Sequence, residues 1–298
     1  MKIRMAVTPP AAALDAAVFG AYLNACERLG FDTVWLSDIP LGPLGDPIVS
    51  LSYAAASTTK LKLGANIVPL GRNPLWLAKQ LAQLDRLCGG RLLLSFVPGL
   101  GAPAERAALG HTDDDRGREV DTMIALLRRW WAGEAVTASY AKFKFDEVTV
   151  QPTPVQRPLE IWLGGIAPAA LARVARVADG WLTSAATPQE AAAGRQTIER
   201  HAAACARTVD PEHFGISIPY SFEPPPEAAL TGLRQRRRDR DLTDIVAVGP
   251  AELRRLIDRY LAAGLSKFVL RPMNALDRAA DWHADLTSLA DVVLPLQT

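Results

Sequence analysis

The feature that most constrains the fold is an alternation along the whole chain between short apolar segments and longer segments of helical periodicity. Eight apolar segments are predicted as strands, at 3–8, 33–37, 61–68, 91–97, 159–163, 180–184, 214–220 and 267–271. A segment with apolar residues at helical spacing follows each strand, at 14–29, 47–58, 74–88, 114–132, 168–178, 188–207, 250–263 and 275–293. Repeated βα units of this kind indicate a parallel sheet covered by helices.

Eight βα units within 298 residues match a (β/α)8 TIM barrel better than a doubly wound sheet. The first predicted strand is not followed by the Gly-x-Gly-x-x-Gly loop of a dinucleotide-binding domain. We therefore predict a single α/β domain over residues 1–298, a (β/α)8 barrel with insertions at about 134–158 and 223–248. The second insertion contains Pro224 to Pro226 and fits no clean period, so we expect an active-site lid or a mobile segment there.

The charged residues nearly balance, since 33 Lys and Arg against 32 Asp and Glu leave a formal net charge of +1. No nucleic acid or other polyanionic partner is therefore expected. No apolar run approaches the ~20 residues that cross a bilayer. The three cysteines are widely spaced, and the four histidines form no metal-binding pair. We expect a cytoplasmic protein without a membrane partner or a metal site.

The predicted catalytic end of such a barrel is formed by the loops at the carboxyl ends of its strands. Gly164-Gly165-Ile166-Ala167 follows the predicted strand 159–163, and Pro168 opens a helix. Glycines let a backbone approach a ligand closely, and the amides at a helix start bind phosphate. The segment is therefore a candidate phosphate loop, with a plain tight turn as the alternative.

Polar residues at other strand ends are candidate site residues. Asp38 follows an apolar strand and is expected to be partly buried, either ligand-bound or in a helix cap or salt bridge. Asn66 ends another apolar run, where it would either face a ligand or be satisfied by the backbone. Two charged runs have simpler interpretations than a binding site. Asp113 to Asp115 are expected to cap a helix. Arg234 to Asp241 are expected to form a solvated helix face, and binding of an anionic cofactor tail by this run is the less favoured alternative.

No nucleophile elbow, P-loop or catalytic triad signature is present in the sequence. This scarcity of acid-base and nucleophilic groups indicates that a bound cofactor supplies the chemistry. A cofactor-free lyase or aldolase is the alternative, but no lysine lies at a predicted strand end, which argues against Schiff-base chemistry.

Seven motifs, in matching order and spacing, give the chain a resemblance to the luciferase-like family of flavin- and deazaflavin-dependent oxidoreductases. They are ERLGFDTVWLSD at 27–38, LGANIVPLGRNP at 63–74, LDRLCGGR at 84–91, RGRE at 116–119, PTPVQ at 152–156, WLGG at 162–165 and ADGW at 178–181. The resemblance spans essentially the whole chain. It implies a barrel with an insertion near the seventh strand and a tricyclic ring at its C-terminal mouth.

The resemblance also implies a set of cofactor-binding residues: Asp38, Asn66, Ile67, Pro98, Gly99, Gly164, Gly165, Ile166, Ala167 and Thr183. In the deazaflavin branch the end of the third strand forms a bulge, often with a non-proline cis peptide, that presses on the ring. Asn66-Ile67 stand at that position. Backbone strain of this kind persists only where its surroundings enforce it.

Three departures from the family pattern concern the site. Ile39 follows Asp38 where the deazaflavin branch commonly has a ring-facing histidine, so no general acid or base is assigned. The turn at Pro98-Gly99 keeps only the last glycine of the usual pattern. Ala167 stands where a serine is frequent, so backbone amides must hold the phosphate. His111, Tyr220 or Arg271 are candidates, by position alone, to polarise a substrate.

The resemblance implies an oxidoreductase dependent on coenzyme F420, which transfers a hydride between C5 of the deazaflavin and a small organic substrate. One alternative is an FMN-dependent two-component monooxygenase that receives reduced flavin from a partner reductase. Another is a cofactor-binding barrel without turnover. A homodimer is common in the family, and the apolar faces with Ile48, Leu51, Leu77 and Leu81 would serve as its interface, unless core packing explains them.

Overall fold

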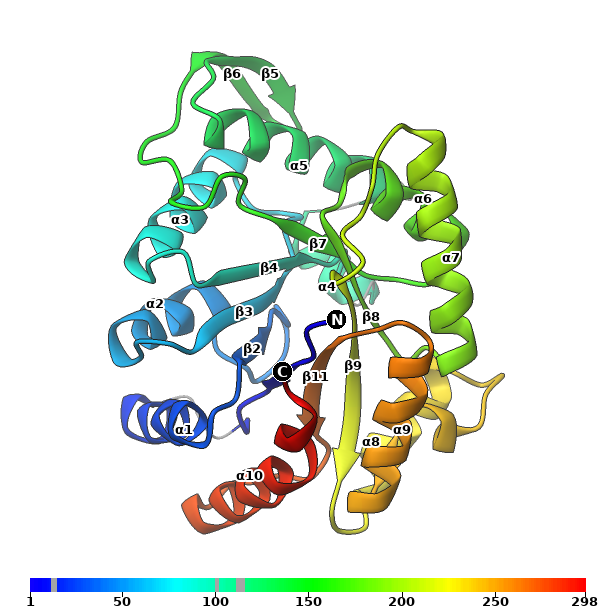
Figure 1. The fold of residues 1–298 in the computed structure, drawn as a ribbon. Coiled ribbons are helices and arrows are strands. Elements are labelled where there is room, and N and C mark those ends of the chain that lie inside the picture. Colours follow the sequence, from blue (N-terminus) through cyan, green and yellow to red (C-terminus); the bar gives the residue numbers. More distant parts are fainter. Residues whose placement is uncertain (12–14, 100–101, 111–115) are drawn as a thin grey trace. The chain divides into compact units, whose positions relative to one another are not determined.

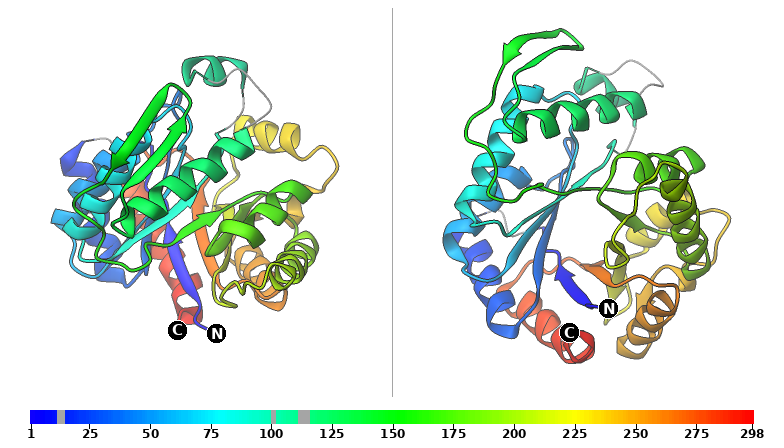
Figure 2. Two further views of the ribbon diagram at one scale, coloured as in Figure 1. Left: turned by 90° about the horizontal axis from the view of Figure 1, so that it is seen from above. Right: turned by 45° about the horizontal axis from the view of Figure 1, so that its top comes forward.

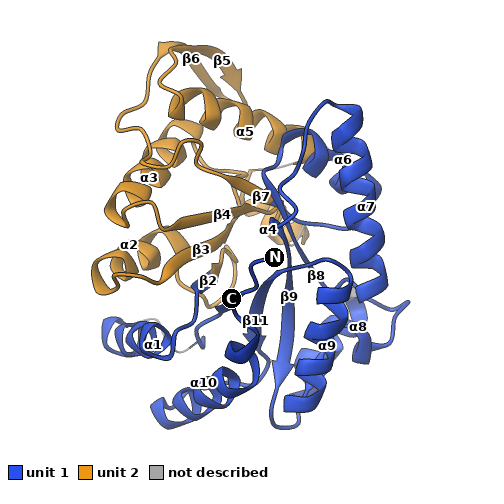
Figure 3. Cartoon of the chain, in the orientation of Figure 1, with its two compact units in different colours: residues 1–35, 163–298 blue, residues 36–162 orange. Residues whose placement is uncertain are grey.

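The computed structural model describes residues 1–11, 15–99, 102–110 and 116–298 (Figure 1). The described chain divides into two compact units (Figure 3). The first unit contains residues 1–35 and 163–298, and the second contains residues 36–162.

Parallel strands form the sheet of the first unit. They are β1 (Arg4–Val7), the first residues of β2 (Thr33–Ser37), β8 (Gly180–Ser184), β9 (Phe214–Ser221), β10 (Ala247–Val248) and β11 (Lys267–Pro272). β1 pairs with β2 and β11, and β9 pairs with β11, β8 and β10. The registers include Met5 opposite Phe268 and Leu182 opposite Gly215. All these pairs are parallel, so the strands of this unit share one carboxyl end.

The helices of the first unit follow its strands in the chain. They are α1 (Ala16–Leu29), α6 (Pro168–Val177), α7 (Pro188–Ala204), α8 (Glu227–Arg236), α9 (Pro250–Ala262) and α10 (Ala279–Val293), with the short 3-10 turns η1 (Leu242–Asp244) and η2 (Leu294–Leu296). Local sequence fixes their starts. Asp15 caps α1 by accepting the amide of Val18 at 2.9 Å, and Thr187 with Glu190 forms a capping box on α7.

The second unit combines a parallel strand pair with helices and a hairpin. Its elements are α2 (Pro47–Ser57), β3 (Lys62–Ile67), α3 (Pro74–Leu87), β4 (Leu92–Phe96), α4 (Pro103–Ala108), α5 (Arg116–Trp131), β5 (Val136–Tyr140), β6 (Phe143–Val148) and most of β7 (Ile161–Leu163). β3 and β4 pair in parallel from Leu63 opposite Leu92 to Ile67 opposite Phe96. The antiparallel hairpin β5–β6 lies beside α5 (Figure 2). Trp130 of α5 joins them, because its ring meets that of Phe145 edge-on at 5.0 Å and its Nε1–H donates to the carbonyl of Val148.

Two polar side chains of the second unit, both within the motif at 84–91, hold neighbouring backbone segments together. The fully buried carboxylate of Asp85 accepts hydrogen bonds from the amides of Val155 and Gln156 at 2.7 and 2.9 Å. Arg91 donates to the carbonyls of Leu61 and Thr58 at 2.6 and 2.9 Å. Replacing either side chain would leave buried backbone groups unpaired, which costs about 1–3 kcal/mol for each group.

Most predicted elements are confirmed, and both predicted insertions contain regular secondary structure. Each predicted strand is present, and β2 and β8 have the predicted bounds. The insertion at 134–158 holds the hairpin β5–β6. The segment 223–248, in which the sequence showed no clean period, contains α8, η1 and β10. The short helix α4 was not predicted, since two turns between prolines give too little periodicity to detect.

The eight βα units therefore occur in the predicted order, with β5, β6 and β10 as additions. Among the helices that the structure describes, none has the length and apolar character required to span a membrane.

Candidate cofactor site

In the second unit, Asp38 is a buried bridging group at the end of β2. Its carboxylate Oδ2 accepts a hydrogen bond from Arg72 at 2.9 Å and from the amide of Val68 at 3.0 Å. Its own amide donates to the carbonyl of Asn66 at 2.9 Å. The side chain is 6% exposed. Of the two interpretations left open by the sequence, the structure shows the salt bridge, and this oxygen of the carboxylate is already engaged by protein groups.

Arg72 extends this cluster into the turn that follows β3. Its guanidinium also contacts Asp46 Oδ2 at 3.2 Å and donates to the carbonyl of Val68 at 3.1 Å. Burial lowers the pKa of Arg72, but Asp38 and Asp46 raise the pKa by more. Arg72 therefore stays charged and fixes the backbone of Val68 between two strand ends.

The bulge expected at Asn66-Ile67 is absent, so that expectation is wrong. β3 stays in register with β4 at both residues. The carbonyl of Asn66 accepts the amide of Asp38, and the carbonyl of Ile67 accepts the amide of Val97 at 3.0 Å. Both carbonyls thus accept hydrogen bonds from residues that directly follow the neighbouring strands, so the backbone continues here without a bulge. The cis peptide bonds found in the described residues precede Pro152 and Pro158.

Asn66 and Ile67 differ in what they offer a ligand. The side chain of Ile67 is fully buried, so only its backbone would reach a cofactor. Asn66 is partly exposed, and its Nδ2 lies 3.5 Å from Ser37 Oγ, to which it donates weakly. Asn66 is thus the one of the two whose side chain is open to a ligand.

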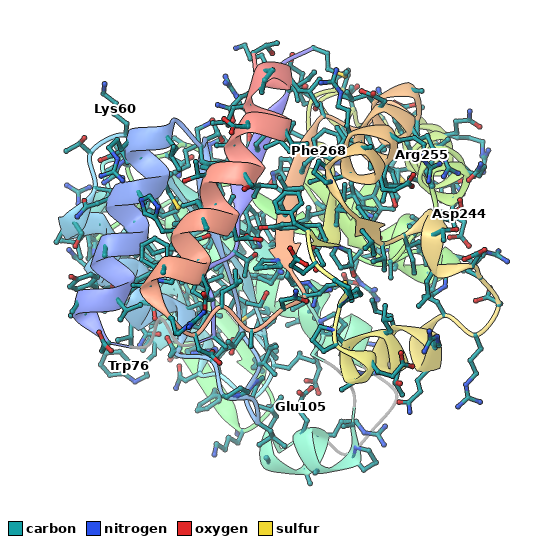
Figure 4. All side chains as sticks on the ribbon, turned by 90° about the horizontal axis from the view of Figure 1, so that it is seen from below. Lys60, Trp76, Glu105, Asp244, Arg255 and Phe268 are labelled. Atoms are coloured by element: carbon teal, nitrogen blue, oxygen red, sulfur yellow. The ribbon has the colours of Figure 1, made fainter. Side chains whose placement is uncertain are left out.

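Gly99, at the turn after β4, packs against a buried carboxylate that the sequence did not reveal. Gly99 has φ +76°, and a Cβ there would lie 2.5 Å from Glu105 Oε1 and 3.8 Å from Val68 Cγ1. Glu105 belongs to α4 and is 3% exposed (Figure 4). A glutamate in a short unpredicted helix gave no sequence signal. Pro98 and Gly99 are thus placed beside the Asp38 cluster, and the next two residues lie outside the described chain.

In the first unit, the candidate phosphate loop is an exposed turn between β7 and α6. A Cβ on Gly164 would lie 2.7 Å from the carbonyl oxygen of Leu182, and Gly165 has φ +94°, so both positions need glycine. Ile166 and Ala167 are exposed, and Ala167 provides no side-chain cap for α6. Within the described residues, the amides of Ile166 and Ala167 donate no hydrogen bond to another backbone group. The turn therefore presents unused donors at a helix start, the arrangement that suits an anion.

Trp181 of β8 holds this turn in place from behind. Its indole is fully buried, and Nε1–H donates to the carbonyl of Gly165 at 2.9 Å. Gly194 of α7 makes room for the ring, since a Cβ there would lie 2.8 Å from Trp181 Cη2. The turn is thus set by a rigid core residue and not by its own sequence alone.

Thr183, two residues along β8, carries a buried hydroxyl without a partner. It is 2% exposed, and within the described residues Oγ1 makes no hydrogen bond. Ser95 of β4, in the second unit, is in the same state and is fully buried. Buried hydroxyls are normally satisfied, so each unpartnered one needs a specific explanation. Ser95 was not predicted as a site residue, because a serine within an apolar strand has an ordinary structural explanation.

The three residues that the sequence offered for polarising a substrate, Tyr220, Arg271 and His111, differ in their surroundings. Tyr220 is buried, and its hydroxyl donates to Asp285 of α10 at 2.5 Å. Burial raises the pKa of Tyr220, and Asp285 raises it further. Tyr220 is therefore engaged with a protein partner and is a poor proton donor. Arg271 is exposed on β11. His111 and the aspartates 113–115 lie outside the described residues.

The arginine-rich segment is only partly a solvated surface, because Arg237 is buried. Arg237 makes hydrogen bonds to both carboxylate oxygens of Glu190 at 2.7 and 3.1 Å and another to the carbonyl of Ala185. Burial alone would raise the pKa of Glu190, but hydrogen bonds from Arg237, from the Thr187 amide and from Arg240 lower this pKa to about 2. Arg237 thus ties the second insertion to the start of α7.

The structure therefore brings the predicted residues together in two groups. Asp38, Asn66 and Ile67 lie beside Pro98 and Gly99 in the second unit. Gly164 to Ala167 lie beside β8, which carries Thr183, in the first unit.

Comparison with known proteins now defines the class. The model of the luciferase-like monooxygenase family matches residues 3–268, and the chain belongs to this family.

Curated relatives include enzymes with two different cofactors. The FMNH2-dependent dimethylsulfone monooxygenase of Pseudomonas putida is 35% identical over 141 residues, which are 46% of this chain and 39% of that enzyme. This chain thus spans about two fifths of the relative's length. The F420-dependent glucose-6-phosphate dehydrogenase of Beutenbergia cavernae is 29% identical over 254 residues, 80% of this chain and 74% of that enzyme.

Solved structures share the fold. Monooxygenase RslO1 from Streptomyces bottropensis superposes with a TM-score of 0.80 at 23% identity, covering 98% of this chain and 99% of that one. The coenzyme F420-dependent tetrahydromethanopterin reductase from Methanopyrus kandleri gives a TM-score of 0.78 at 17% identity, covering 100% of both chains. The predicted fold class, the luciferase-like (β/α)8 TIM barrel, is confirmed.

Proposed function

We propose that this chain is a coenzyme F420-dependent oxidoreductase that transfers a hydride between the deazaflavin and a small organic substrate. The observation that carries the proposal is the exposed Gly164–Ala167 turn, which presents unused amides at the start of α6. F420 carries a phosphodiester on the side chain of its ring, and a helix start with free amides is suited to hold it.

The residues of the turn fit this group without a serine. Ala167 removes one hydroxyl donor, but the amides of Ile166 and Ala167 remain available, and the helix dipole favours an anion there. The unpartnered hydroxyl of Thr183 offers a further donor on the neighbouring strand. When bound, F420 supplies a carbon at position five of its ring that accepts or gives a hydride.

The protein's share is binding and orientation. The Asp38–Arg72 pair fixes the ends of β2 and β3, so that Asn66 is presented from a rigid backbone. We expect Asp38 to act through this rigidity, because its amide and its Oδ2 are both engaged by protein groups. Ile67, Pro98 and Gly99 would contribute backbone surface. No residue is assigned a proton-transfer role, because Ile39 provides no titratable group.

We prefer F420 to FMN because the similarity to an F420-dependent relative extends over more of this chain. The F420-dependent relative from Beutenbergia cavernae matches 80% of this chain, whereas the match to the FMNH2-dependent enzyme of Pseudomonas putida covers 46%.

A second candidate is an FMN-dependent monooxygenase supplied by a partner flavin reductase. The higher identity to the dimethylsulfone monooxygenase, 35% over 141 residues, supports it, and so does a β3 without the expected bulge. FMN also carries a phosphate, so the Gly164–Ala167 turn would serve both cofactors.

The phosphate loop is tested by Gly165→Ala. Gly165 has φ +94°, and a methyl group there would lie 2.9 Å from Ala170 Cβ, so the turn must shift. The amides of Ile166 and Ala167 would then no longer point at the bound phosphate. We expect F420 affinity, followed by quenching of cofactor fluorescence, to fall about tenfold or more, the equivalent of one charged hydrogen bond.

Gly232→Ala is the matched control, because a Cβ at this position of α8 meets no atom within 4 Å. It should bind F420 like the unmodified protein. Equal F420 affinity in the two variants would contradict the placement of the phosphate at this turn.

A further inference from the structure

The insertion between β9 and α9 contains a cavity that the phosphate loop does not use. Its volume is about 540 Å3, within the range of small-molecule pockets. It lies entirely in the first unit, is partly open to solvent, and is lined by residues of α8 and of the segments on either side of it. The lining residues are Pro225, Leu230, Arg234, Arg240, Asp241, Leu242, Thr243, Val246 and Val248.

The walls of the cavity are anchored at the carboxyl ends of strands. Leu233, Ile245 and Val246 form a buried cluster that packs against Ala185, just after β8, and Met273, just after β11. Asp244 of η1 (labelled in Figure 4) pairs with Arg259 of α9 at 2.8 Å. The cavity is therefore a built part of the fold, at the strand ends where barrel enzymes bind substrates.

One side of the cavity is apolar. Leu230, Leu242, Val246 and Val248 contribute aliphatic side chains from three elements. Val248 is 45% exposed, so a large part of its side chain is in contact with water at this cavity. An aliphatic ligand would cover this surface and gain the usual free energy of removing it from water.

Two arginines on the same cavity form ion pairs near the surface. Arg240 donates to Glu190 and to the carbonyl of Asp239, both at 3.0 Å, lies 3.4 Å from the Asp239 carboxylate, and remains 42% exposed. Glu190 would keep its hydrogen bonds from other donors if Arg240 turned to a ligand. Arg234 pairs with Glu227, whose side chain is 73% exposed, and such surface pairs contribute little.

The acidic residue among the lining residues does not cancel these charges. The Asp241 carboxylate accepts the amide of Thr243 at 3.0 Å and so is directed at its own turn. Two arginines and one aspartate line the cavity, and the carboxylates that pair with the arginines, those of Glu227, Glu190 and Asp239, lie outside its lining. A guanidinium favours a carboxylate partner.

We propose that this cavity binds an amphipathic carboxylate, with an aliphatic chain against Leu230, Leu242, Val246 and Val248 and its carboxylate on Arg234 and Arg240. That such a molecule is the substrate class rests on the proposed function. The binding itself does not depend on the cofactor.

Calorimetric titration of the full chain with sodium octanoate, at fixed ionic strength and without cofactor, tests the proposal. We expect saturable one-site binding that is at least about tenfold weaker for octanamide, which lacks the charge, and for acetate, which lacks the chain. Arg240→Gln and Arg234→Gln should each weaken octanoate binding about tenfold. Val248→Asp, a change at an exposed position, should abolish measurable binding through repulsion and loss of the apolar wall.

Arg254→Gln is the control, since Arg254 lies on α9, pairs with Asp258 and does not line the cavity. It should bind octanoate like the unmodified protein. The proposal is overturned if octanoate does not saturate, if octanamide binds equally well, or if folded Arg234→Gln and Val248→Asp variants keep full affinity. Failure of octanoate with intact F420 binding would remove only this site, and the converse result would remove only the proposed cofactor.

Discussion

Single hydroxyl groups distinguish a binding site from a structural core in this chain. Thr58 and Thr183 are both buried, at 5% and 2% exposure. The hydroxyl of Thr58 donates to the carbonyl of Ala54 at 2.7 Å and accepts from Arg91 at 2.9 Å. The hydroxyl of Thr183 has no partner among the described residues. The two residues therefore predict opposite responses to the same substitution.

Thr183→Val should leave the free energy of unfolding unchanged or raise it by up to about 1 kcal/mol, because it removes an unpaired buried hydroxyl. The same substitution should weaken cofactor binding about tenfold if the hydroxyl serves the ligand. Urea unfolding and fluorescence titration measure the two effects.

Thr58→Val is the matched control. It should lower the free energy of unfolding by about 1–3 kcal/mol and leave cofactor affinity unchanged. A Thr183→Val variant that is destabilised like Thr58→Val, with normal affinity, would show that Thr183 is an ordinary core residue.

For single residues, the sequence predicted which side chains are buried better than it predicted their hydrogen-bond partners. The burial of Asp38 follows from its place after an apolar strand. Its bond to Arg72, 34 residues further on, depends on the turn after β3 and could not be found from local pattern. Glu105 was missed for the same reason, since only the folded turn brings its carboxylate onto Gly99.

Among the elements, α8 and the turns after it are tied to α7 by the ion pair between the buried Arg237 and the partly buried Glu190. The pair bridges the second insertion and the capping box of α7. Its carboxylate is 23% exposed, so solvent screens it only in part. The stability of this insertion is therefore expected to depend on pH.

The pKa of Glu190 is lowered from 4.5 to about 2, so its charged form stabilises the folded state by about 3 kcal/mol. This contribution is fully present above pH 4.5 and is lost as the pH falls toward 2. Glu190→Gln should thus destabilise the protein at pH 7, and the difference from the unmodified protein should shrink by more than half at pH 3. Urea unfolding at both values provides the measurement.

Glu199→Gln, on the same helix, removes an exposed pair with Arg195 and should change the free energy of unfolding by less than about 0.5 kcal/mol. A constant difference between Glu190→Gln and the unmodified protein from pH 7 to pH 3 would refute the role of the pair.

Element prediction succeeded where the hydrophobic period was long and failed where it was short. The starts of α3 at Pro74 and of α7 at Pro188 were predicted to the residue, whereas α7 ends three residues before its predicted end. α8 was missed because its start after three prolines and its many arginines hide a ten-residue helix. The absence of the bulge at Asn66 was also unpredictable, since it depends on the strands on either side of β3.

For the whole molecule, the predicted homodimer needs a different surface from the one first considered. Ile48, Leu51, Leu77 and Leu81 are all buried in the second unit, so core packing accounts for them. The exposed apolar side chains of α2 and α3 are Val49 at 70%, Tyr53 at 39% and Trp76 at 59% (Figure 4 labels Trp76). We expect these exposed side chains to supply the interface, since contiguous exposed apolar patches mark interaction sites.

Trp76→Lys should therefore convert a dimer into a monomer without loss of thermal stability, because the indole makes little contact within its own chain. Light scattering coupled to gel filtration, over a range of concentrations, measures the mass. An unmodified protein that is monomeric throughout, or a variant that stays dimeric, would contradict this interface.

The fold of the whole chain was predictable because eight repeated βα units leave few alternatives. The choice of cofactor was not, because the curated relatives include both FMNH2-dependent and F420-dependent enzymes. The residues that separate F420 from FMN depend on ring contacts that the alternation of elements does not encode.

Paired titration of the purified chain with F420 and with FMN, at one ionic strength and followed by cofactor fluorescence, tests the central claim most directly. The account predicts saturable F420 binding at micromolar concentration or below, at least about tenfold tighter than FMN. Tighter binding of FMN would contradict the hydride-transfer proposal and favour oxygen chemistry with a reductase partner. Binding of neither would remove the redox assignment altogether.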